Sequence, residues 1–318
     1  MERMCAMRKQ DAPFSIQIEF TEGCNLMCEF CGIHGIRMGY GCYRFMTPNT
    51  LENIAIQIAD AGWNSRIELA MHGEPTLNKN HIEYIKVLRR YLPKNQIMMT
   101  TNGANVDVPA LFDAGLNILA VDAYREVLGK VMAIHEQTEL AHIAWYEYPK
   151  QPEGNPHKRY KPRTQFVTFM EDPRDAGIGT HSKLKNHCGC ADELDMAHVN
   201  KRCARPFREL AIRWDGSVAL CCDDFRGVYK CGNVLDYVNI EDLWNNDQFE
   251  AARSMLYHRQ RNFKPCLGCN AISHRVGCLP DKLGKTETPE PNYSMCEIIK
   301  NATAGEPYTA AVLRPWEE

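Results

Sequence analysis

The chain has 318 residues, a formal net charge of -3 and a charged fraction of 24%. It is long enough to bury a sizeable core, and its overall charge does not demand a polyanionic partner. It contains no apolar run long enough to span a membrane, and residues 1–10 lack the apolar core of a signal peptide, so we expect a cytoplasmic protein. Fifteen cysteines in such a chain indicate metal ligation in a reducing compartment rather than disulfides.

Three cysteines lie on one short segment, directly after an alternating apolar stretch over residues 16–20 that predicts the first strand. Their C-x3-C-x2-C spacing places three thiolates on a loop, and soft sulfur ligands suit iron–sulfur clusters. Three thiolates would hold three corners of a 4Fe-4S cube and leave one iron open to a small molecule. A zinc knuckle or three structural thiols could use the same spacing. The residues are Cys24, Cys28 and Cys31.

Helices and strands are expected to alternate through the first half. Thr47 is a capping residue before Pro48, and together they predict a helix that ends at Gly62. A second helical periodicity ends at Pro93. Further strands are expected over residues 67–71, 97–99, 116–121, 143–146 and 165–170. The pattern predicts right-handed βαβ crossovers and a parallel α/β sheet of about six strands, in the form of an open partial barrel.

Polar motifs stand at the ends of two of these strands. His-Gly-Glu-Pro occupies residues 72–75, and Thr-Thr-Asn-Gly occupies residues 100–103. The carboxyl ends of parallel strands form the rim on which α/β proteins build their sites. The cysteine segment, Gly-Glu-Pro and Thr-Asn-Gly follow one another in the order of three signatures of the radical S-adenosylmethionine (radical SAM) superfamily, which this chain resembles.

The resemblance implies a (β/α)6 TIM-like architecture with a cofactor site on the rim. The three cysteines would bind the 4Fe-4S cluster, and S-adenosylmethionine would chelate its open iron. One electron from the cluster would then cleave S-adenosylmethionine to a 5'-deoxyadenosyl radical, which removes hydrogen from a substrate carbon. The implied cofactor-binding residues are Phe30 near the adenine, Gly73, Glu74 as acceptor for the amino group, Asn102 and Asp122.

A second group of cysteines lies in the later part of the chain, around an Asp-Gly hairpin signal at residues 215–216. This region resembles the SPASM and shorter "twitch" modules of radical SAM enzymes. The resemblance implies that four thiolates fully ligate an auxiliary 4Fe-4S cluster. A zinc site with the same ligands is the alternative. The four implied ligands are Cys203, Cys221, Cys266 and Cys269.

The region departs from full SPASM modules, which carry ligands for two auxiliary clusters, so we expect one cluster here. Cys222 could replace Cys221, because adjacent residues on a strand face opposite sides and the register is unknown. The other cysteines are expected to be buried or incidental thiols, with the last two as a reserve pair for a second auxiliary cluster. They are Cys188, Cys190, Cys231, Cys278 and Cys296.

Within the superfamily, the chain most resembles the twitch-bearing aminocyclitol dehydrogenases of the 2-deoxy-scyllo-inosamine type. In that group the substrate radical loses a second electron, which the auxiliary cluster is suited to accept. A turn that carries a substrate-binding arginine there holds His187 here, between Asn186 and Cys188. His187 could contact the substrate, accept a proton or serve only the structure.

These features predict a radical SAM core over residues 1–185, an α+β auxiliary module over 186–279 and a C-terminal arm over 280–318. The expected reaction is oxidation or epimerisation of a cyclitol, sugar or nucleotide, with flavodoxin or ferredoxin as electron donor. A ribosomal peptide or a nucleobase in nucleic acid is an alternative substrate, and the basic stretch over 150–163 would suit nucleic acid. A zinc-binding or electron-transfer protein is the non-enzymatic alternative.

Overall fold

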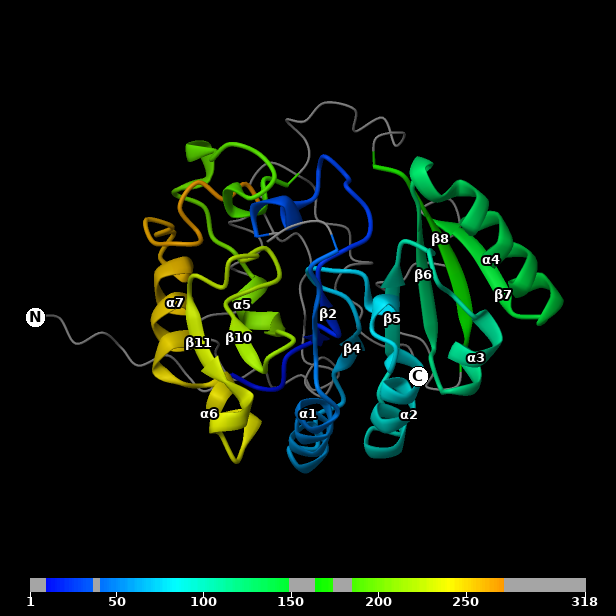
Figure 1. Ribbon diagram of the computed structural model, residues 1–318. Coiled ribbons are helices and arrows are strands. Elements are labelled where there is room, and N and C mark those ends of the chain that lie inside the picture. Colours follow the sequence, from blue (N-terminus) through cyan, green and yellow to red (C-terminus); the bar gives the residue numbers. More distant parts are fainter. Residues whose placement is uncertain (1–9, 37–40, 149–163, 174–184, 272–318) are drawn as a thin grey trace, which may run out of the picture.

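A mostly parallel sheet of nine strands organises the chain (Figure 1). The computed structural model describes residues 10–36, 41–148, 164–173 and 185–271. The α/β prediction is confirmed, and the strand order in the sheet is β11-β10-β9-β1-β4-β5-β6-β8-β7. The strands are β1 (Ser15–Ile18), β4 (Arg66–Glu68), β5 (Ile97–Thr101), β6 (Ile118–Ala123), β7 (Ala144–Tyr148), β8 (Phe166–Glu171), β9 (Glu209–Ile212), β10 (Ser217–Ala219) and β11 (Lys230–Asn233). A separate antiparallel pair joins β2 (Thr21–Glu22) to β3 (Arg44–Phe45).

The six strands expected in the first half form, but the last two do not follow chain order. β8 pairs with β6 from Ile118 opposite Phe166 onward, and β7 takes the outer edge beside β8. The pattern of burial explains the exchange. The side chains of residues 166–169 on β8 are buried, whereas Trp145 on β7 is 37% exposed. An apolar strand suits the interior of a parallel sheet and a half-polar strand suits its edge.

Four α-helices accompany the described residues of the first half. In Figure 1, α1 (Pro48–Asp60) and α2 (His81–Tyr91) lie toward the lower end of the view, while α3 (Val108–Asp113) and α4 (Leu128–Leu140) lie at the right. The predicted start of α1 is confirmed, since the Thr47 hydroxyl accepts the Thr50 amide hydrogen bond at 3.2 Å and Pro48 begins the helix. α2 ends before Pro93, as its sequence indicated.

The two faces of the sheet differ in polarity. Ile16, Ile67 and Ile97 are in register on one face and belong to the main apolar core together with residues of α1 and α2. On the other face, β1 and β4 carry polar side chains, and Gln17 donates to the Glu68 carboxylate at 3.3 Å. These polar side chains therefore lie next to β9, the first strand that the second half of the chain adds to the sheet.

The cysteine-rich region continues the same sheet. β9 pairs in parallel with β1, from Ser15 opposite Glu209 to Ile18 opposite Ile212, and β10 and β11 extend the edge as antiparallel strands. The Asp-Gly signal is confirmed as the β9–β10 hairpin, where Gly216 has φ +81°. Three α-helices belong to the described part of this α+β region: α5 (Arg205–Arg208), α6 (Ile240–Trp244) and α7 (Asp247–Tyr257).

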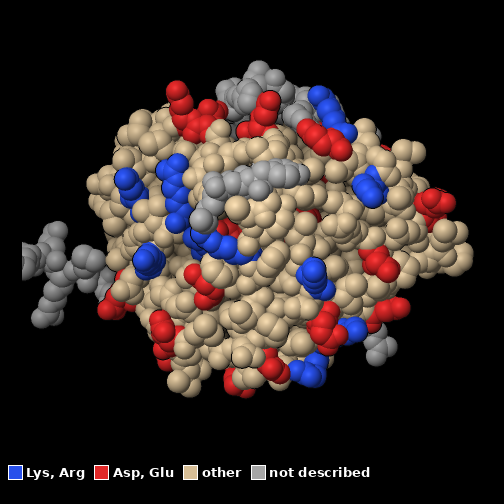
Figure 2. Space-filling model, in the orientation of Figure 1, with Lys and Arg blue, Asp and Glu red and all other residues tan. Residues whose placement is uncertain are grey.

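Charge on the surface is mixed. Figure 2 shows lysine and arginine interspersed with aspartate and glutamate over one face, in keeping with the formal net charge of -3. No helix of the described residues is long and apolar enough to cross a membrane. Three predicted features lie outside the described residues: the basic stretch over residues 150–163, the reserve cysteines at 278 and 296, and the C-terminal arm over 280–318. Within the described residues, the sheet is continuous from β11 to β7.

Candidate functional site

The first cysteine loop is joined to the Gly-Glu-Pro turn through backbone contacts. Gly23, one residue before Cys24, forms a parallel bridge with Gly73, and the Glu74 amide donates to the Gly23 carbonyl at 3.0 Å. A β-carbon on Gly73 would lie 2.3 Å from the Thr21 carbonyl oxygen and 2.4 Å from that of Gly23. Glycine is therefore required at position 73 for the two segments to approach one another.

Glu74 connects the ends of β4 and β5. It precedes the short helix η2 (Pro75–Leu77), and its buried carboxylate accepts hydrogen bonds from the amide and the hydroxyl of Thr76 at 3.1 and 2.7 Å. It also accepts from the Thr101 hydroxyl and the Asn102 amide, both at 2.7 Å. Burial raises the pKa of Glu74, and these donors offset part of the rise. Two of the predicted strand-end motifs thus meet at this carboxylate.

Asn102 links β5 to the cysteine loop. Its side-chain amide donates to the Cys24 sulfur at 3.4 Å and to the Asn25 side chain at 2.9 Å. Burial raises the pKa of Cys24 to about 11, and Glu74 and Cys31 lie close enough to add to the rise. A cationic cluster would reverse this effect, because a bound metal deprotonates its thiol ligands.

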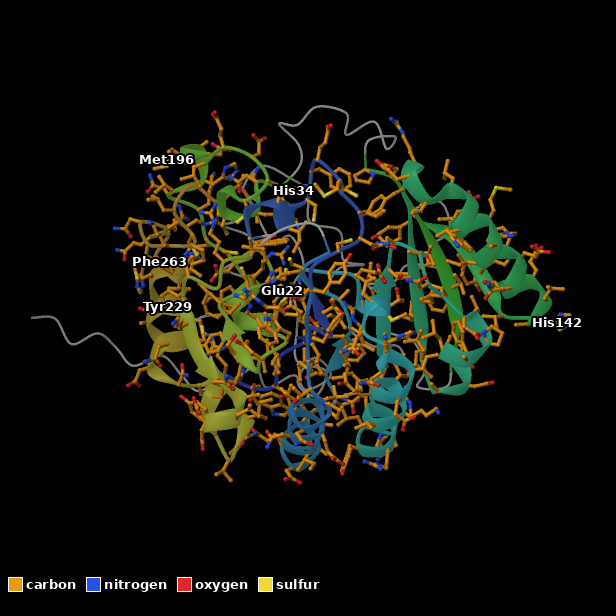
Figure 3. The ribbon with its side chains drawn as sticks, viewed as in Figure 1. Glu22, His34, His142, Met196, Tyr229 and Phe263 are labelled. Atoms are coloured by element: carbon orange, nitrogen blue, oxygen red, sulfur yellow. The ribbon has the colours of Figure 1, made fainter. Side chains whose placement is uncertain are left out.

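The loop presents its three thiols at one end of the sheet. Cys28 is buried, Cys24 and Cys31 are half-buried, and the Cys31 amide donates to the Cys28 carbonyl at 3.0 Å. Figure 3 shows His34, just after this loop, at the upper end of the molecule. Among the described residues, no three His, Cys, Asp or Glu side chains meet as ligands of a single metal ion. A 4Fe-4S cube binds each thiolate on a different iron, and three soft thiols on one loop fit that group.

An aromatic and acidic group lies beside the loop. The rings of Phe30 and Tyr124 are 5.6 Å apart, and the Tyr124 hydroxyl donates to the Asp122 carboxylate at 3.1 Å. Burial raises the pKa of Asp122 to about 7, and the charges of Glu74 and Asp172 contribute to the rise. Tyr124 was not anticipated from the sequence, although its place two residues after Asp122, just beyond the end of β6, was a usable signal.

The second set of cysteines gathers where β10, α5 and the segment after α7 meet. All four predicted ligands are buried, and the charges of Cys203, Cys266 and Cys269 each raise the pKa of at least one other member. Cys221 is close to Cys266, whereas Cys222 points to the Arg205 guanidinium and the Glu209 carboxylate. The side chains of the pair thus face opposite sides, with Cys221 toward the other cysteines.

Arg261 organises the end of this region and was not anticipated. Its guanidinium is fully buried and donates to the Cys269 carbonyl at 3.0 Å and to the Ala271 carbonyl at 3.1 Å. It also donates to the carbonyls of Lys201 and Arg202. One side chain thus ties the segment before Cys203 to the segment that holds Cys266 and Cys269.

Two of the cysteines expected to be incidental differ in their surroundings. Cys231 is fully buried within the main core, as predicted. Cys188 instead lies beside Cys269 and near Cys221, and its role stays a prediction. Its interaction with Cys269 raises the pKa of Cys188.

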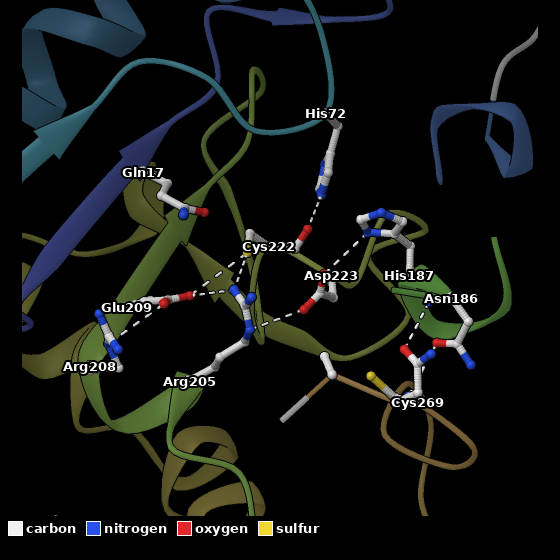
Figure 4. A network of polar contacts seen from close by, with 12 residues as sticks. Gln17, His72, Asn186, His187, Arg205, Arg208, Glu209, Cys222, Asp223 and Cys269 are labelled. Carbon is white, nitrogen blue, oxygen red and sulfur yellow. Dashed lines mark hydrogen bonds and ion pairs between the residues drawn. The ribbon is translucent and has the colours of Figure 1, made fainter. Parts of the chain in front are cut away.

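His187 lies in a buried polar network (Figure 4). Its Nδ1 is 3.2 Å from the Asp223 carboxylate, whose other oxygen is 3.0 Å from the Arg205 guanidinium. Burial opposes ionisation of Asp223, but the charges of Arg205 and nearby Lys185 outweigh it and hold the pKa of this carboxyl well below its usual range. Arg205 also pairs with Glu209 at 2.9 Å.

The two cysteine regions touch through short helical turns. Gly32 begins the turn η1 (Gly32–Gly35) directly after Cys31, and a β-carbon on it would lie 2.7 Å from that of His187, in η6 (His187–Gly189). A β-carbon on Gly35 would lie 2.8 Å from that of Cys190. Phe225 fills the same contact, with its ring 4.9 Å from the ring of His187. The structure therefore brings together two loops that are far apart in the sequence.

Family models match both parts of the chain. The model of the radical SAM superfamily matches residues 18–124, and that of the iron-sulfur cluster-binding SPASM domain matches residues 203–270. These ranges include the first cysteine loop, the strand-end motifs and all four buried cysteines of the second set.

Two curated relatives illustrate the likeness in sequence. The chain is 24% identical over 266 residues to an S-adenosyl-L-methionine-dependent 2-deoxy-scyllo-inosamine dehydrogenase of Niallia circulans, over 81% of this chain and 93% of the relative. It is 35% identical over 105 residues to a probable GTP 3',8-cyclase of Pyrococcus horikoshii, over 32% of each chain. The likeness to the cyclase is thus confined to about a third of either protein.

Two solved structures resemble the fold. The crystal structure of BtrN in complex with AdoMet and 2-DOIA has a TM-score of 0.64 and 21% identity, and the comparison covers 83% of this chain and 95% of that one. An open conformation of BtrN has a TM-score of 0.58 and 19% identity, over 83% and 94% of the two chains. At these identities the likeness shows the fold.

Proposed function

This chain is a radical SAM enzyme that carries an iron–sulfur SPASM domain, and on that premise we propose that it oxidises a small polar substrate, such as a cyclitol, by two electrons. Its cofactors are S-adenosylmethionine, a 4Fe-4S cluster that binds it and an auxiliary cluster. The relative of Niallia circulans, a dehydrogenase by name that matches this chain over 81% of its length, supports oxidation rather than epimerisation.

The side chains on the rim suit the first two groups. Cys24, Cys28 and Cys31 would hold the first cluster, with Phe30 and Asp122 beside it. Glu74 would accept a hydrogen bond from the amino group of S-adenosylmethionine, since each carboxylate oxygen has more than one lone pair. Gly73 and Asn102 keep the turn and the loop in place for this contact. When bound, these groups supply a 5'-deoxyadenosyl radical that abstracts a hydrogen atom from substrate carbon.

The observation that carries the proposal is the contact between the two cysteine regions. Gly32 follows Cys31 directly and packs against His187, one residue from Cys188 in the second region. A substrate held at this junction would lose one hydrogen atom on the side of the first loop and one electron toward the second. One proton must then leave as well for the oxidation to balance.

His187 would receive that proton or contact the substrate. The Asp223 carboxylate holds its Nδ1 at 3.2 Å, so a neutral ring would carry its proton there and keep Nε2 as the acceptor. Arg205 fixes Asp223 in turn at 3.0 Å. The carboxylate thus orients the ring, a role that partners of functional histidines commonly have.

The test begins with protein reconstituted anaerobically with iron and sulfide. We expect about eight irons per chain and, after reduction by dithionite or by reduced flavodoxin or ferredoxin, formation of 5'-deoxyadenosine. Cys24→Ala should abolish 5'-deoxyadenosine and leave about four irons, because the auxiliary set is intact. The paired change Cys266→Ala and Cys269→Ala should leave only about four irons, those of the first cluster, and should abolish the oxidised product.

Product mass distinguishes the reactions. With a panel of cyclitols, sugars and nucleotides, oxidation yields a product lighter by two hydrogens, whereas epimerisation leaves the mass unchanged and exchanges one hydrogen with solvent. A product of unchanged mass, or turnover that persists in the paired cysteine variant, would contradict the proposal. Turnover of a peptide or nucleic acid in place of every small molecule would contradict the substrate class.

A further inference from the structure

His72 lies where the first cysteine loop, the Gly-Glu-Pro turn and the auxiliary region meet. It is buried, and it lies beyond the end of β4 at Glu68, so the strand alone does not fix its position. Its backbone carbonyl accepts a hydrogen bond at 3.3 Å from the amide of Gly23, one residue before Cys24. The turn that continues from His72 carries Glu74, the residue that the proposed function assigns to S-adenosylmethionine.

The ring of His72 reaches the auxiliary region. Its Nε2 is 2.9 Å from the carbonyl oxygen of Cys222, the residue after the implied ligand Cys221 (Figure 4). A carbonyl oxygen can only accept, so Nε2 carries the hydrogen in this contact. The ring also packs against that of Phe225, with the two centroids 4.2 Å apart. One side chain therefore joins the Gly-Glu-Pro turn to a segment 150 residues away in the chain.

We propose that His72 is a positioning residue for S-adenosylmethionine: its hydrogen bond to the Cys222 carbonyl holds the turn from the auxiliary side and keeps Glu74 in place to accept the amino group. The inference rests on the proposed function in one respect, the contact of Glu74 with S-adenosylmethionine. His72 acts through Glu74, because both of its ring nitrogens face groups of the protein. Nδ1 is 3.1 Å from the carboxylate of Glu19.

The backbone between His72 and Glu74 explains why this anchor matters. Gly73 separates them and has no β-carbon, so the chain has more conformational freedom here than at other residues. The residue on either side must therefore be held by its own contacts. Glu74 is held toward β5 by the Thr101 hydroxyl at 2.7 Å, and His72 is held toward the auxiliary region by Cys222. Without the second contact the turn would spend less time in the binding orientation, which weakens the apparent affinity in proportion.

The experiment measures binding of S-adenosylmethionine to anaerobically reconstituted protein with oxidised clusters, in which no cleavage occurs. Equilibrium dialysis of the parent, His72→Gln and His72→Asn gives the Kd and the number of sites per chain. The amide nitrogen of glutamine lies as many bonds from the β-carbon as Nε2 of histidine, whereas that of asparagine lies closer and cannot reach Cys222. His72→Asn should raise the Kd about three- to tenfold, the contribution of one hydrogen bond, and His72→Gln should stay within about twofold of the parent.

His81 provides the matched control. Its Nδ1 is likewise 2.8 Å from a backbone carbonyl, that of Asn78, but this contact stays within the chain turn that leads into α2. His81→Asn should leave both the Kd and the number of sites unchanged, because the contact does not connect the turn to the auxiliary region. An increase in Kd as large as that of His72→Asn would overturn the proposal.

The remaining outcomes separate positioning from folding and from the proposed function. A Kd for His72→Asn equal to that of the parent would overturn the proposal, and so would a glutamine variant as weak as the asparagine variant. Fewer sites at an unchanged Kd, or the loss of all sites, would show that His72 serves only folding and would overturn it too. A parent protein that binds iron but no S-adenosylmethionine would instead refute the proposed function, and this inference with it.

Discussion

At position 73 the structure leaves no room for a side chain. Backbone oxygens of Thr21 and Gly23 lie 2.3 and 2.4 Å from where a β-carbon would stand. Backbone atoms cannot rotate aside as the end of a flexible side chain can. Gly73→Ala should therefore lower the free energy of unfolding by ~1–3 kcal/mol, the usual cost of overpacking, as measured by urea denaturation.

A glycine on α4 provides the matched control for that change. Apart from its chain neighbours and the nearby backbone of α4, no atom lies within 4 Å of a β-carbon built on Gly129, and its φ is not in the left-handed region. Gly129→Ala should raise stability by ~0.4–1 kcal/mol, because alanine restricts the unfolded chain. Equal effects of the two substitutions would contradict the close approach at Gly73.

Asp122 makes stability depend on pH. Burial raises its pKa to about 7 in the folded protein, against about 3.9 for an unperturbed aspartate. The folded chain thus binds this proton more tightly than the unfolded chain. The resulting stabilisation is fully present below pH ~4 and is lost as the pH rises through ~7.

Asp122→Asn should reduce this loss. In cluster-free protein, the decline in the free energy of unfolding between pH 5 and pH 8 should be smaller in the variant by on the order of 2 kcal/mol, since asparagine does not titrate. Urea unfolding at both pH values measures the difference. An identical decline in both proteins would mean that the Asp122 carboxyl ionises near its usual pKa in the folded state.

At the scale of the elements, Glu19 connects three strands, β1, β4 and β9, at the ends that meet near the site. It follows β1, and its fully buried carboxylate accepts hydrogen bonds from the backbone amides of His72, after β4, and Trp214, after β9, at 3.1 and 3.2 Å. His72 also places its Nδ1 at 3.1 Å from the same carboxylate. The Glu19 amide itself donates to the Ile212 carbonyl at 2.9 Å.

Glu19→Ala would leave the His72 and Trp214 amides without their acceptor. Each buried donor that loses its partner costs ~1–3 kcal/mol, and the free energy of unfolding should fall accordingly. Glu83→Ala removes an exposed partner of Lys86 and should cost below ~1 kcal/mol. A loss no larger for Glu19→Ala than for this control, again by urea denaturation, would show that Glu19 does not join the elements.

At the scale of the whole molecule, the core and the cysteine-rich region share one sheet. β1 pairs with β4 on one side and with β9 on the other. Gln57 on α1 donates to the carbonyls of Val234 and Tyr237 at 3.0 Å each, beyond β11. The Trp244 indole donates to the Asp11 carbonyl at 2.7 Å. We therefore expect the two regions to unfold together, although the sequence motifs divide them.

Hydrogen exchange of reconstituted protein under increasing denaturant tests this expectation. Amides of β1 and β9 should report the same free energy of opening, because the ladder between them makes the two regions one cooperative unit. Mass spectrometry of peptides from both strands measures it. Exchange of β9 to β11 at a clearly lower free energy, with β1 still protected, would show an auxiliary module that opens by itself.

The cysteine spacing, the strand-end motifs and the helix at residues 48–60 could all be predicted from the sequence, because each depends on residues close together in the chain. Ligand spacing on a loop, capping by Thr47 and the alternation of apolar residues are local properties. The same holds for the Asp-Gly hairpin. The radical SAM superfamily and the SPASM region were accordingly visible without the structure.

Other features depend on which distant segments pack together, and only the tertiary structure decided them. Three contacts join residues far apart in the sequence: the position of β8 between β6 and β7, the parallel pairing of β9 with β1, and the contact of Gly32 with His187. The contact between the turn at Asn186 and the segment at Asn270 belongs with them. Reciprocal hydrogen bonds of these two asparagines hold together two loops that are far apart in the sequence, and no local pattern encodes them.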